Sequence, residues 1–266
     1  MNLLLKHVKL FWRLTLVGFK RDTSFSTDLL ISTLQFILYT LLFVAFWKAI
    51  VAHSGRLSHW QEHELVILTF VIALHSVLLV FFYGIMDLPE SIRAGNLDKY
   101  LCRPIHSLFM VCFEAVPVIE FSRAFVVNIA MVCVAFIHYG VTPSIVNVML
   151  GFLLLVIGSL IIVLMTGTIA VMSFWFVQIG PLWSIFNWAK NFMRYPVDIF
   201  PAALAFSLSW VIPLGLTATY PVMILLDKPL PAVNIFAGAV LLLFLWSAVF
   251  YFTSRKALSV YEAFGG

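Results

Sequence analysis

The chain has 266 residues, of which 63% are hydrophobic and 11% are charged, and its formal net charge is +4. Soluble domains are about 45–50% apolar and about 25% charged, so this composition, with a mean hydropathy of +1.06, excludes a soluble fold. We therefore expect an all-α integral membrane protein, because helices satisfy their own backbone hydrogen bonds in lipid. The three cysteines have no spacing typical of a disulfide framework or a zinc site.

The first 25 residues predict an amphipathic helix that lies in the membrane interface. At about 100° per residue, its basic side chains form a narrow stripe and most apolar side chains face the other way. The stripe contains Lys6, Lys9, Arg13 and Lys20. Anionic headgroups attract such a face, although an ordinary cytosolic anchor would also be basic. Arg13 interrupts the early apolar run, so we expect no cleavable signal peptide.

Six apolar runs are long enough to cross a bilayer, which takes about 20 residues. We expect spans at residues 29–51, 64–86, 109–137, 147–177, 197–216 and 232–253. Pro201 and Pro213 interrupt the fifth run, so a bent or re-entrant segment is expected on the outer side between spans five and six. No repeat or soluble domain is apparent, and residues 1–266 are expected to form a single transmembrane domain.

Basic residues are distributed unevenly between the two sides of this predicted bundle. Of the 16 lysines and arginines, all but Lys48, Arg56 and Lys228 fall on one side when the spans are counted. The positive-inside rule then places both termini in the cytosol. The aromatic and basic segment 181–196 is expected to lie along the cytosolic surface between spans four and five.

A polar insert, residues 87–104, separates the second and third spans. Asp87 can cap a helix that has Pro89 in its first turn and Gly95 as its stop signal. Asn96 can then cap a second short helix. The insert is therefore expected to be a helix, a corner and a helix, held beneath the membrane.

Within this insert, IRAGNLDKYLCRP resembles the segment G-x-L-D-x-x-L-x-R-P of the ABC-2 type permease family, in a subgroup once classed as a domain of unknown function. FMRYPVDIFP, SWVIPLGLTATYP and LLDKPLP are similar to the aromatic and proline pattern of that subgroup. The resemblance covers essentially the whole chain. It implies six spans per subunit, two permease subunits that are identical or paralogous, and two separate ATPase subunits that carry ATP and Mg.

The resemblance also implies that residues 87–104 are the coupling segment that contacts the ATPase. The residues that carry this role are Arg93, Gly95, Leu97, Asp98, Leu101, Arg103 and Pro104. A stiff segment would transmit ATPase motion to spans two and three, whereas a disordered loop would absorb it. The 266 residues contain no G-x-x-x-x-G-K-[ST] motif, so the ATP-binding site is expected on another subunit.

Ionisable residues within spans are candidates for a transport pathway. In the third span these are Glu114, Glu120 and Arg123, of which Glu120 and Arg123 are also spaced to neutralise each other. The resemblance implies that the proline-rich region forms short re-entrant helices at an outer gate. Its candidate gate residues are Phe200, Phe206 and Trp210.

Three further polar features each have a structural and a functional interpretation. Asp198 is expected to pair with Arg194, four residues earlier. The outer loop HSGRLSHWQEHE gathers histidines and glutamates, but their spacing matches no metal site, and we expect none. His75 is expected to be a polar residue between helices rather than a proton relay.

Together these features predict a permease subunit without ATPase activity of its own, in the bacterial plasma (inner) membrane, that exports a hydrophobic, amphiphilic, lipid-like or cationic small molecule. No cofactor is expected in this chain, and no nucleic acid partner. One alternative is a proton-coupled transporter that uses Glu114, Glu120 or His75. The other is a membrane-embedded lipid-modifying enzyme, but the candidate groups for such a site lie on opposite sides of the predicted membrane.

Overall fold

The structure, a computed structural model, describes residues 12–13, 15–16, 18, 26–95, 102, 110–111, 116–176 and 178–260. This part of the chain is mostly helical and contains no β-strand beyond an isolated bridge between Leu57 and Trp60. The expected all-α architecture is confirmed for it. Most of the predicted interfacial helix, residues 1–25, lies outside the described residues.

Five helices in the described part are long and apolar enough to cross a membrane. They are α2 (Ser26–Ser54), α3 (Glu62–Leu79), α8 (Val118–Tyr139), α9 (Ile145–Val171) and α13 (Ala232–Val260). The second span continues beyond α3 through η1 (Val80–Phe82), α4 (Tyr83–Met86) and α5 (Leu88–Arg93). The first, second, third, fourth and sixth predicted runs each correspond to one of these helices.

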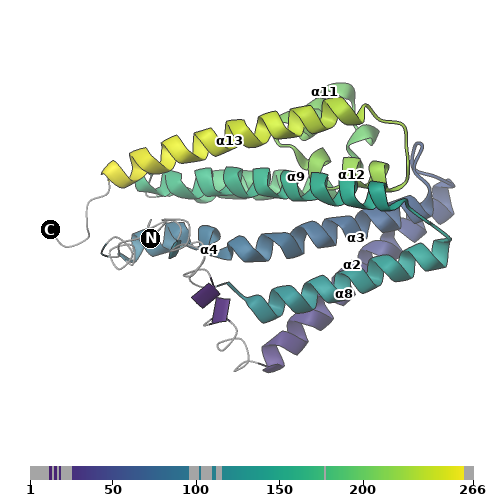
Figure 1. Ribbon diagram of the computed structural model, residues 1–266, viewed down its shortest axis with the longest axis horizontal. Coiled ribbons are helices and arrows are strands. Elements are labelled where there is room, and N and C mark those ends of the chain that lie inside the picture. The colour runs from purple at the N-terminus through teal and green to yellow at the C-terminus, as the bar shows by residue number, and fades with distance from the viewer. Residues whose placement is uncertain are drawn as a thin grey trace.

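The five helices are arranged so that two of them form the centre of the bundle (Figure 1). α3 and α9 are largely buried, whereas α2, α8 and α13 are largely exposed. Exposed apolar residues such as Leu34, Val134 and Phe244 cover these outer helices. We call the end that holds the connections at 55–61, 140–144 and 226–231 the loop end, and the end that holds α5 the terminal end.

Residues 197–216, the proline-interrupted run expected as the fifth span, form several short helical pieces rather than a helix of membrane-spanning length. The chain is divided into η4 (Val197–Ile199), α11 (Ala202–Phe206), η5, a π-helical turn (Ser207–Val211), η6 (Leu214–Thr217) and α12 (Thr219–Leu225). Proline cannot donate the helical hydrogen bond, and Pro201, Pro213 and Pro221 all fall in this region. The expected proline-broken segment therefore begins at Val197 and includes the run assigned to the fifth span.

Two glycines of α9 allow this broken segment to approach the helix backbone. A Cβ at Gly158 would lie 2.7 Å from the carbonyl oxygen of Leu216, and one at Gly151 would lie 3.1 Å from that of Pro221. Leu214 and Leu216 are fully buried. Non-helical backbone at the depth of the middle of α9 is thus enclosed by protein, as lipid requires.

The segment 181–196, expected along the cytosolic surface between spans four and five, reaches the middle of the bundle in the structure. It forms α10 (Gly180–Lys190) and η3 (Asn191–Arg194), which pass beside the middle of α2 and α3. The guanidinium of Arg194 is 4.9 Å from the ring centre of Phe43, and the ring of Tyr195 is 5.7 Å from that of Trp47. Phe186 and Met193 are buried against the bundle, which draws one face of the segment inward, whereas Trp188 and Phe192 remain exposed.

Candidate functional site

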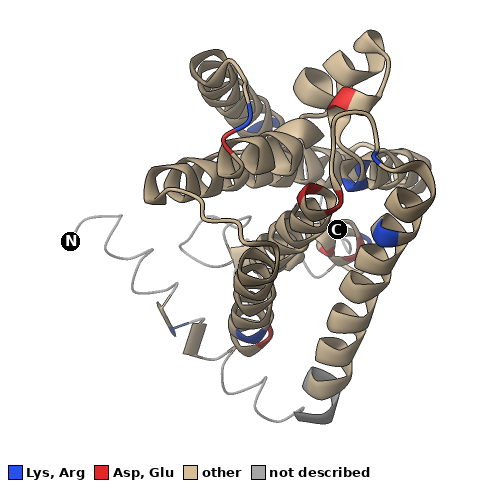
Figure 2. Ribbon diagram, turned by 90° about the vertical axis from the view of Figure 1, so that its right-hand side faces the viewer, with Lys and Arg blue, Asp and Glu red and all other residues tan. Residues whose placement is uncertain are grey.

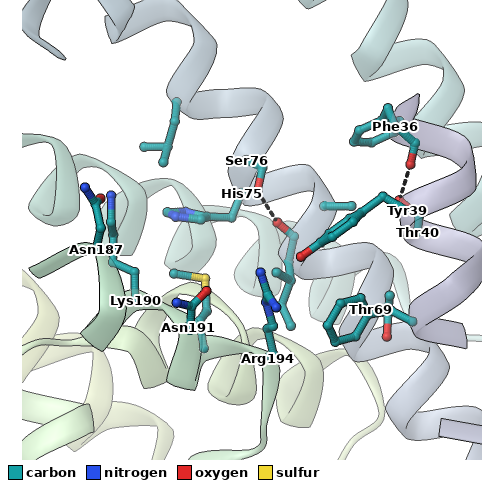
Figure 3. Close-up of a pocket in the computed structure, with 15 residues that line it drawn as sticks. Phe36, Tyr39, Thr40, Thr69, His75, Ser76, Asn187, Lys190, Asn191 and Arg194 are labelled. Atoms are coloured by element: carbon teal, nitrogen blue, oxygen red, sulfur yellow. Dashed lines mark hydrogen bonds between the residues drawn. The ribbon is translucent and has the colours of Figure 1, made fainter. Parts of the chain in front are cut away.

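A cavity of about 400 Å³ lies between α2, α3 and the α10–η3 segment, at the middle of the bundle (Figure 3). Fifteen residues line it: Phe36, Tyr39, Thr40, Phe43, Thr69, Ile72, Ala73, His75, Ser76, Leu79, Asn187, Lys190, Asn191, Met193 and Arg194. The volume falls in the range of ligand pockets, about 300–1,000 Å³. The cavity combines apolar walls with a few polar groups.

The cavity has a buried floor and an exposed mouth. Thr40 and Thr69 are buried in the floor, where each hydroxyl donates to a carbonyl of its own helix, Thr40 to Phe36 at 2.8 Å and Thr69 to Leu65 at 3.0 Å. Tyr39 and Asn191 are exposed, so the cavity opens on the surface between α2 and η3. A ligand could therefore enter from the side of the bundle.

Two cations of the α10–η3 segment line this cavity, one helical turn apart. Arg194 lies over the rings of Phe43 and Tyr39, 4.9 and 5.5 Å from their centres, and Lys190 lies 5.3 Å from the ring centre of Phe186. None of the fifteen described lining residues is acidic. The cavity therefore carries an excess of positive charge, partly compensated by aromatic faces.

His75 is buried beside these cations and contributes an acceptor. Its Nδ1 lies 2.7 Å from the hydroxyl oxygen of Ser159, which itself donates its only proton to the carbonyl of Leu155. This arrangement favours Nδ1 as the donor, which leaves Nε2 as the unprotonated nitrogen of the neutral ring. This buried Nε2 has no hydrogen-bond partner among the described residues. Figure 3 shows the ring pointing toward Lys190 and Asn187.

A second polar group, which we call the loop-end cluster, consists of His59, Trp60, Glu64, Asp198 and Lys228. Asp198 accepts from the indole nitrogen of Trp60 at 2.9 Å and lies 2.8 Å from Nε2 of His59. Lys228 binds the carboxylate of Glu64 at 2.7 Å and lies 4.1 Å from the ring centre of Trp60. These contacts join the start of α3 to both ends of the broken segment (Figure 2 looks onto this end).

The loop-end cluster corrects the expected pairing of Asp198 with Arg194. The two residues contact different partners, because η3 and the turn at Pro196 carry Asp198 to the loop end while Arg194 faces α2. In the described part of the chain, no group of three His, Cys, Asp or Glu side chains is placed to hold a metal ion. The two glutamates of this region form ion pairs instead, Glu62 with Lys48 and Glu64 with Lys228.

Only two of the predicted coupling residues, Arg93 and Gly95, are described. Gly95 ends α5 with a φ of +68° and a hydrogen bond to Ile92, as expected. Arg93 is exposed and pairs with Glu90 at 2.7 Å. Five residues lie outside the described part: Leu97, Asp98, Leu101, Arg103 and Pro104. Asp87 makes no capping hydrogen bond, because α4 leads almost directly into α5 and leaves no free helix start.

The α5 helix is held firmly to the bundle despite its six residues. Leu88 and Ile92 are buried in a cluster with Val171 of α9 and Ala257 of α13. Its exposed face carries the Glu90–Arg93 pair. The helix thus connects the second span to the ends of two other helices at the terminal end.

Of the three candidate residues in the third span, the structure describes Glu120 and Arg123, both at the start of α8. Arg123 donates to the hydroxyls of Ser32 and Thr33 on α2, and no ion pair between Arg123 and Glu120 occurs among the described residues. Neither residue lines the central cavity. Glu114 lies outside the described residues. The expected Glu120–Arg123 pair is therefore replaced by a contact between helices.

The three candidate gate residues lie in the broken segment but do not converge. The ring of Phe200 contacts those of Phe192 and Tyr195, 5.7 and 6.4 Å away between centres. Phe206 is exposed on α11, and the ring of Trp210 packs against Gly238 of α13. The sequence analysis did not predict that Lys190 and Arg194 line a cavity. Their i, i+4 spacing, which places both on one side of a helix, is the sequence signal that could have indicated it.

Comparison with known families gives one match. The family described as ABC-2 family transporter protein matches residues 36–265, which include every described helix from the second half of α2 onward. The comparisons with curated proteins and with solved structures give no match.

Proposed function

Because the chain belongs to the ABC-2 family of transporter proteins, we propose that it is the permease subunit of an ATP-binding cassette exporter of amphiphilic molecules. The observation that carries this proposal is the family match over residues 36–265, joined to five apolar helices of membrane-spanning length. A permease forms the path, and the energy for transport comes from ATP bound elsewhere. The chain would act without cofactor chemistry of its own.

The partners in this proposal are a pair of ATPase subunits, which hold ATP and Mg, and a second permease subunit that is identical or paralogous. The absence of a G-x-x-x-x-G-K-[ST] motif from these 266 residues supports an ATPase site on another chain. The exposed apolar faces of α2, α8 and α13 offer surface for lipid and for the second permease.

The terminal end is the proposed docking surface for the ATPase. The second span runs as one apolar helical stretch from Glu62 to Arg93, so α5 is a continuation of it rather than a separate loop. Burial of Leu88 and Ile92 makes α5 move with the bundle. Closure of the ATPase pair on ATP would push this helix and tilt the second span, which changes the opening of the path.

This arrangement implies an orientation in the membrane. In the sequence, most lysines and arginines precede the first span, follow the last or lie between spans two and three. Of these, Arg93, Arg255 and Lys256 are described at the terminal end, which supports a cytosolic terminal end. Lys190 and Arg194 no longer count toward this rule because they line the central cavity. The protein would be a multi-pass protein of the bacterial plasma membrane with both termini in the cytosol.

The broken segment at the loop end is the proposed outer gate. Contacts from His59, Trp60 and Glu64 to Asp198 and Lys228 hold it to the start of α3. Alternating access would require these contacts to break when the terminal end closes. A proton-coupled mechanism has less support, since Glu120 does not line the cavity that contains His75.

Purification of the tagged chain with its bound proteins tests the proposal. A cysteine introduced at Arg93 should crosslink to a protein that contains a Walker A motif, and a cysteine at Arg56, at the loop end, should not. Reconstituted transport should require ATP and that partner. Transport by the chain alone, with no ATPase captured at position 93, would overturn the proposal.

A further inference from the structure

We propose that the central cavity binds the anionic headgroup, a phosphate or a carboxylate, of a single amphiphilic molecule. This inference rests on the proposed function and deepens it by naming the class of cargo. It also narrows the sequence-based expectation, which included cationic molecules. The feature that carries it is a pair of cations, Lys190 and Arg194, that lines a cavity at membrane depth without an acidic partner.

The positive charge of the cavity is not neutralised by the described residues around it. Ionisable groups at membrane depth are costly and usually pair with an opposite charge. The aromatic faces of Phe43, Tyr39 and Phe186 compensate the two cations in part, but such contacts do not neutralise them. None of the described carboxylates lies within 4.0 Å of either cation. An anionic ligand would supply the missing charge.

The polar groups around the cations can donate hydrogen bonds to an oxyanion. The guanidinium of Arg194 can donate two parallel hydrogen bonds to a carboxylate or phosphate, and Lys190 adds a point charge one turn away. The amides of Asn187 and Asn191 can donate further bonds from the same segment (Figure 3).

The rest of the cavity is suited to an apolar chain. Phe36, Ile72, Leu79 and Met193 line the space beside the polar groups. A volume of about 400 Å³ accommodates a headgroup and the first part of a chain, but not an entire lipid. Because the mouth opens at Tyr39 on the side of the bundle, the remainder of the chain can stay in the apolar surroundings.

A cationic amphiphile is excluded by the same groups. Aromatic faces are the groups that attract a quaternary ammonium group, and the rings of Phe43 and Tyr39 are already covered by Arg194. It would also lie beside two like charges. A neutral headgroup would leave the excess positive charge uncompensated. The cavity therefore discriminates by the sign of the headgroup charge.

The test is a binding titration of the full chain in dodecyl maltoside micelles with three probes: dodecyl phosphate, dodecyltrimethylammonium and inorganic phosphate. Dodecyl phosphate should bind and raise the melting temperature, and dodecyltrimethylammonium should not. Inorganic phosphate should bind at least tenfold more weakly than dodecyl phosphate. Equal binding of the two phosphates would show a site for a free anion and overturn the amphiphile proposal.

Variants locate the binding in the cavity. The double variant Lys190→Gln, Arg194→Gln should weaken dodecyl phosphate binding at least tenfold, whereas Arg255→Gln, Lys256→Gln, an exposed basic pair on α13, should not. If the first variant fails to fold, Ala73→Leu fills the buried floor while both charges remain, and should also weaken binding. Unchanged affinity in a folded cavity variant would overturn the proposal.

The outcomes separate this inference from the proposed function. If an ATPase is captured at position 93 but the cavity binds no anion, the proposed cargo class is wrong and the proposed permease function stands. If the cavity binds anions in a charge-dependent way but no ATPase is captured, the anion site is supported and the ATP-driven permease function is wrong. The titration needs neither nucleotide nor partner, so its result does not depend on reconstituted transport.

Discussion

The carboxylate of Asp198 accepts a hydrogen bond from the indole nitrogen of Trp60 at 2.9 Å, which joins two residues that are 138 positions apart. Trp60 is fully buried, so its indole N–H depends on an acceptor within the protein, and Asp198 supplies one. His59 approaches the other carboxylate oxygen at 2.8 Å. One acidic side chain therefore ties the connection between α2 and α3 to the start of the broken segment.

Replacing Asp198 should loosen this end of the bundle. Asp198→Ala leaves the buried indole N–H of Trp60 without an acceptor, which costs about 1–3 kcal/mol. Asp198→Asn retains an oxygen acceptor and should cost clearly less. Thermal unfolding in detergent micelles measures both. Arg56→Ala, an exposed change in the same connection, should have almost no effect. Equal losses for Ala and Asn would show that the hydrogen bond to Trp60 is unimportant.

Removing only the lysine of the Lys228–Glu64 ion pair should destabilise the fold more than removing both charges. The pair is mostly buried, with side-chain exposures of 15% and 9%. Lys228→Met leaves the Glu64 carboxylate without its cation, and we expect a loss of about 2–4 kcal/mol in unfolding free energy.

The matched double variant tests this interpretation. Lys228→Met combined with Glu64→Gln removes both charges, while the glutamine can still accept from the backbone N–H of Gln61. The double variant should therefore melt at a higher temperature than Lys228→Met alone. If the two changes simply add, the lysine stabilises the fold through its contact with the Trp60 ring and not through Glu64.

Gly158 should not tolerate a side chain, because the backbone of Leu216 leaves no room for it. A Cβ there would lie 2.7 Å from the carbonyl carbon and oxygen of that residue. Gly158→Ala improves helix propensity by about 0.5–1 kcal/mol, but the overlap should cost about 1–3 kcal/mol, so we expect a net loss of stability. The control is Gly180→Ala, where no atom lies within 4 Å and stability should not fall.

Hydropathy was sufficient to predict the five long helices, because each is a continuous apolar run of membrane-spanning length. The same measure failed between residues 178 and 231. There, Pro201, Pro213 and Pro221 break the apolar run into short helices. In addition, α10 and η3, which pass beside α2 and α3, contain as many aromatic residues as a segment at the membrane interface. Composition cannot distinguish an aromatic residue packed on α2 from one at a headgroup.

The polar sites were predictable only where the contacts are local. Gly95 ends α5 as its sequence neighbours indicate, since a helix stop depends on a single turn. The predicted pairing of Asp198 with Arg194 was wrong, because each residue contacts a distant part of the chain. Arg194 contacts α2, and Asp198 contacts the connection that follows α2. The central cavity needs α2, α3 and η3 together, and no spacing in the sequence brings those three segments side by side.

Arg93 offers the sharpest test of coupling, because its local contribution to stability is small. Its pair with Glu90 is exposed, and such pairs contribute about 0–1 kcal/mol. Arg93→Glu should therefore leave the melting temperature nearly unchanged and weaken association with the ATPase at least about tenfold, or about 1.4 kcal/mol. Copurification and ATP hydrolysis by the complex measure the effect.

The exchange of charges distinguishes docking from local structure. Glu90→Arg combined with Arg93→Glu restores an ion pair at the same spacing on α5, but presents the opposite charge at position 93. If Arg93 contacts the ATPase, the exchange should not restore association. If it does restore association, Arg93 acts only by holding Glu90, and the ATPase must contact other residues of the segment 87–104.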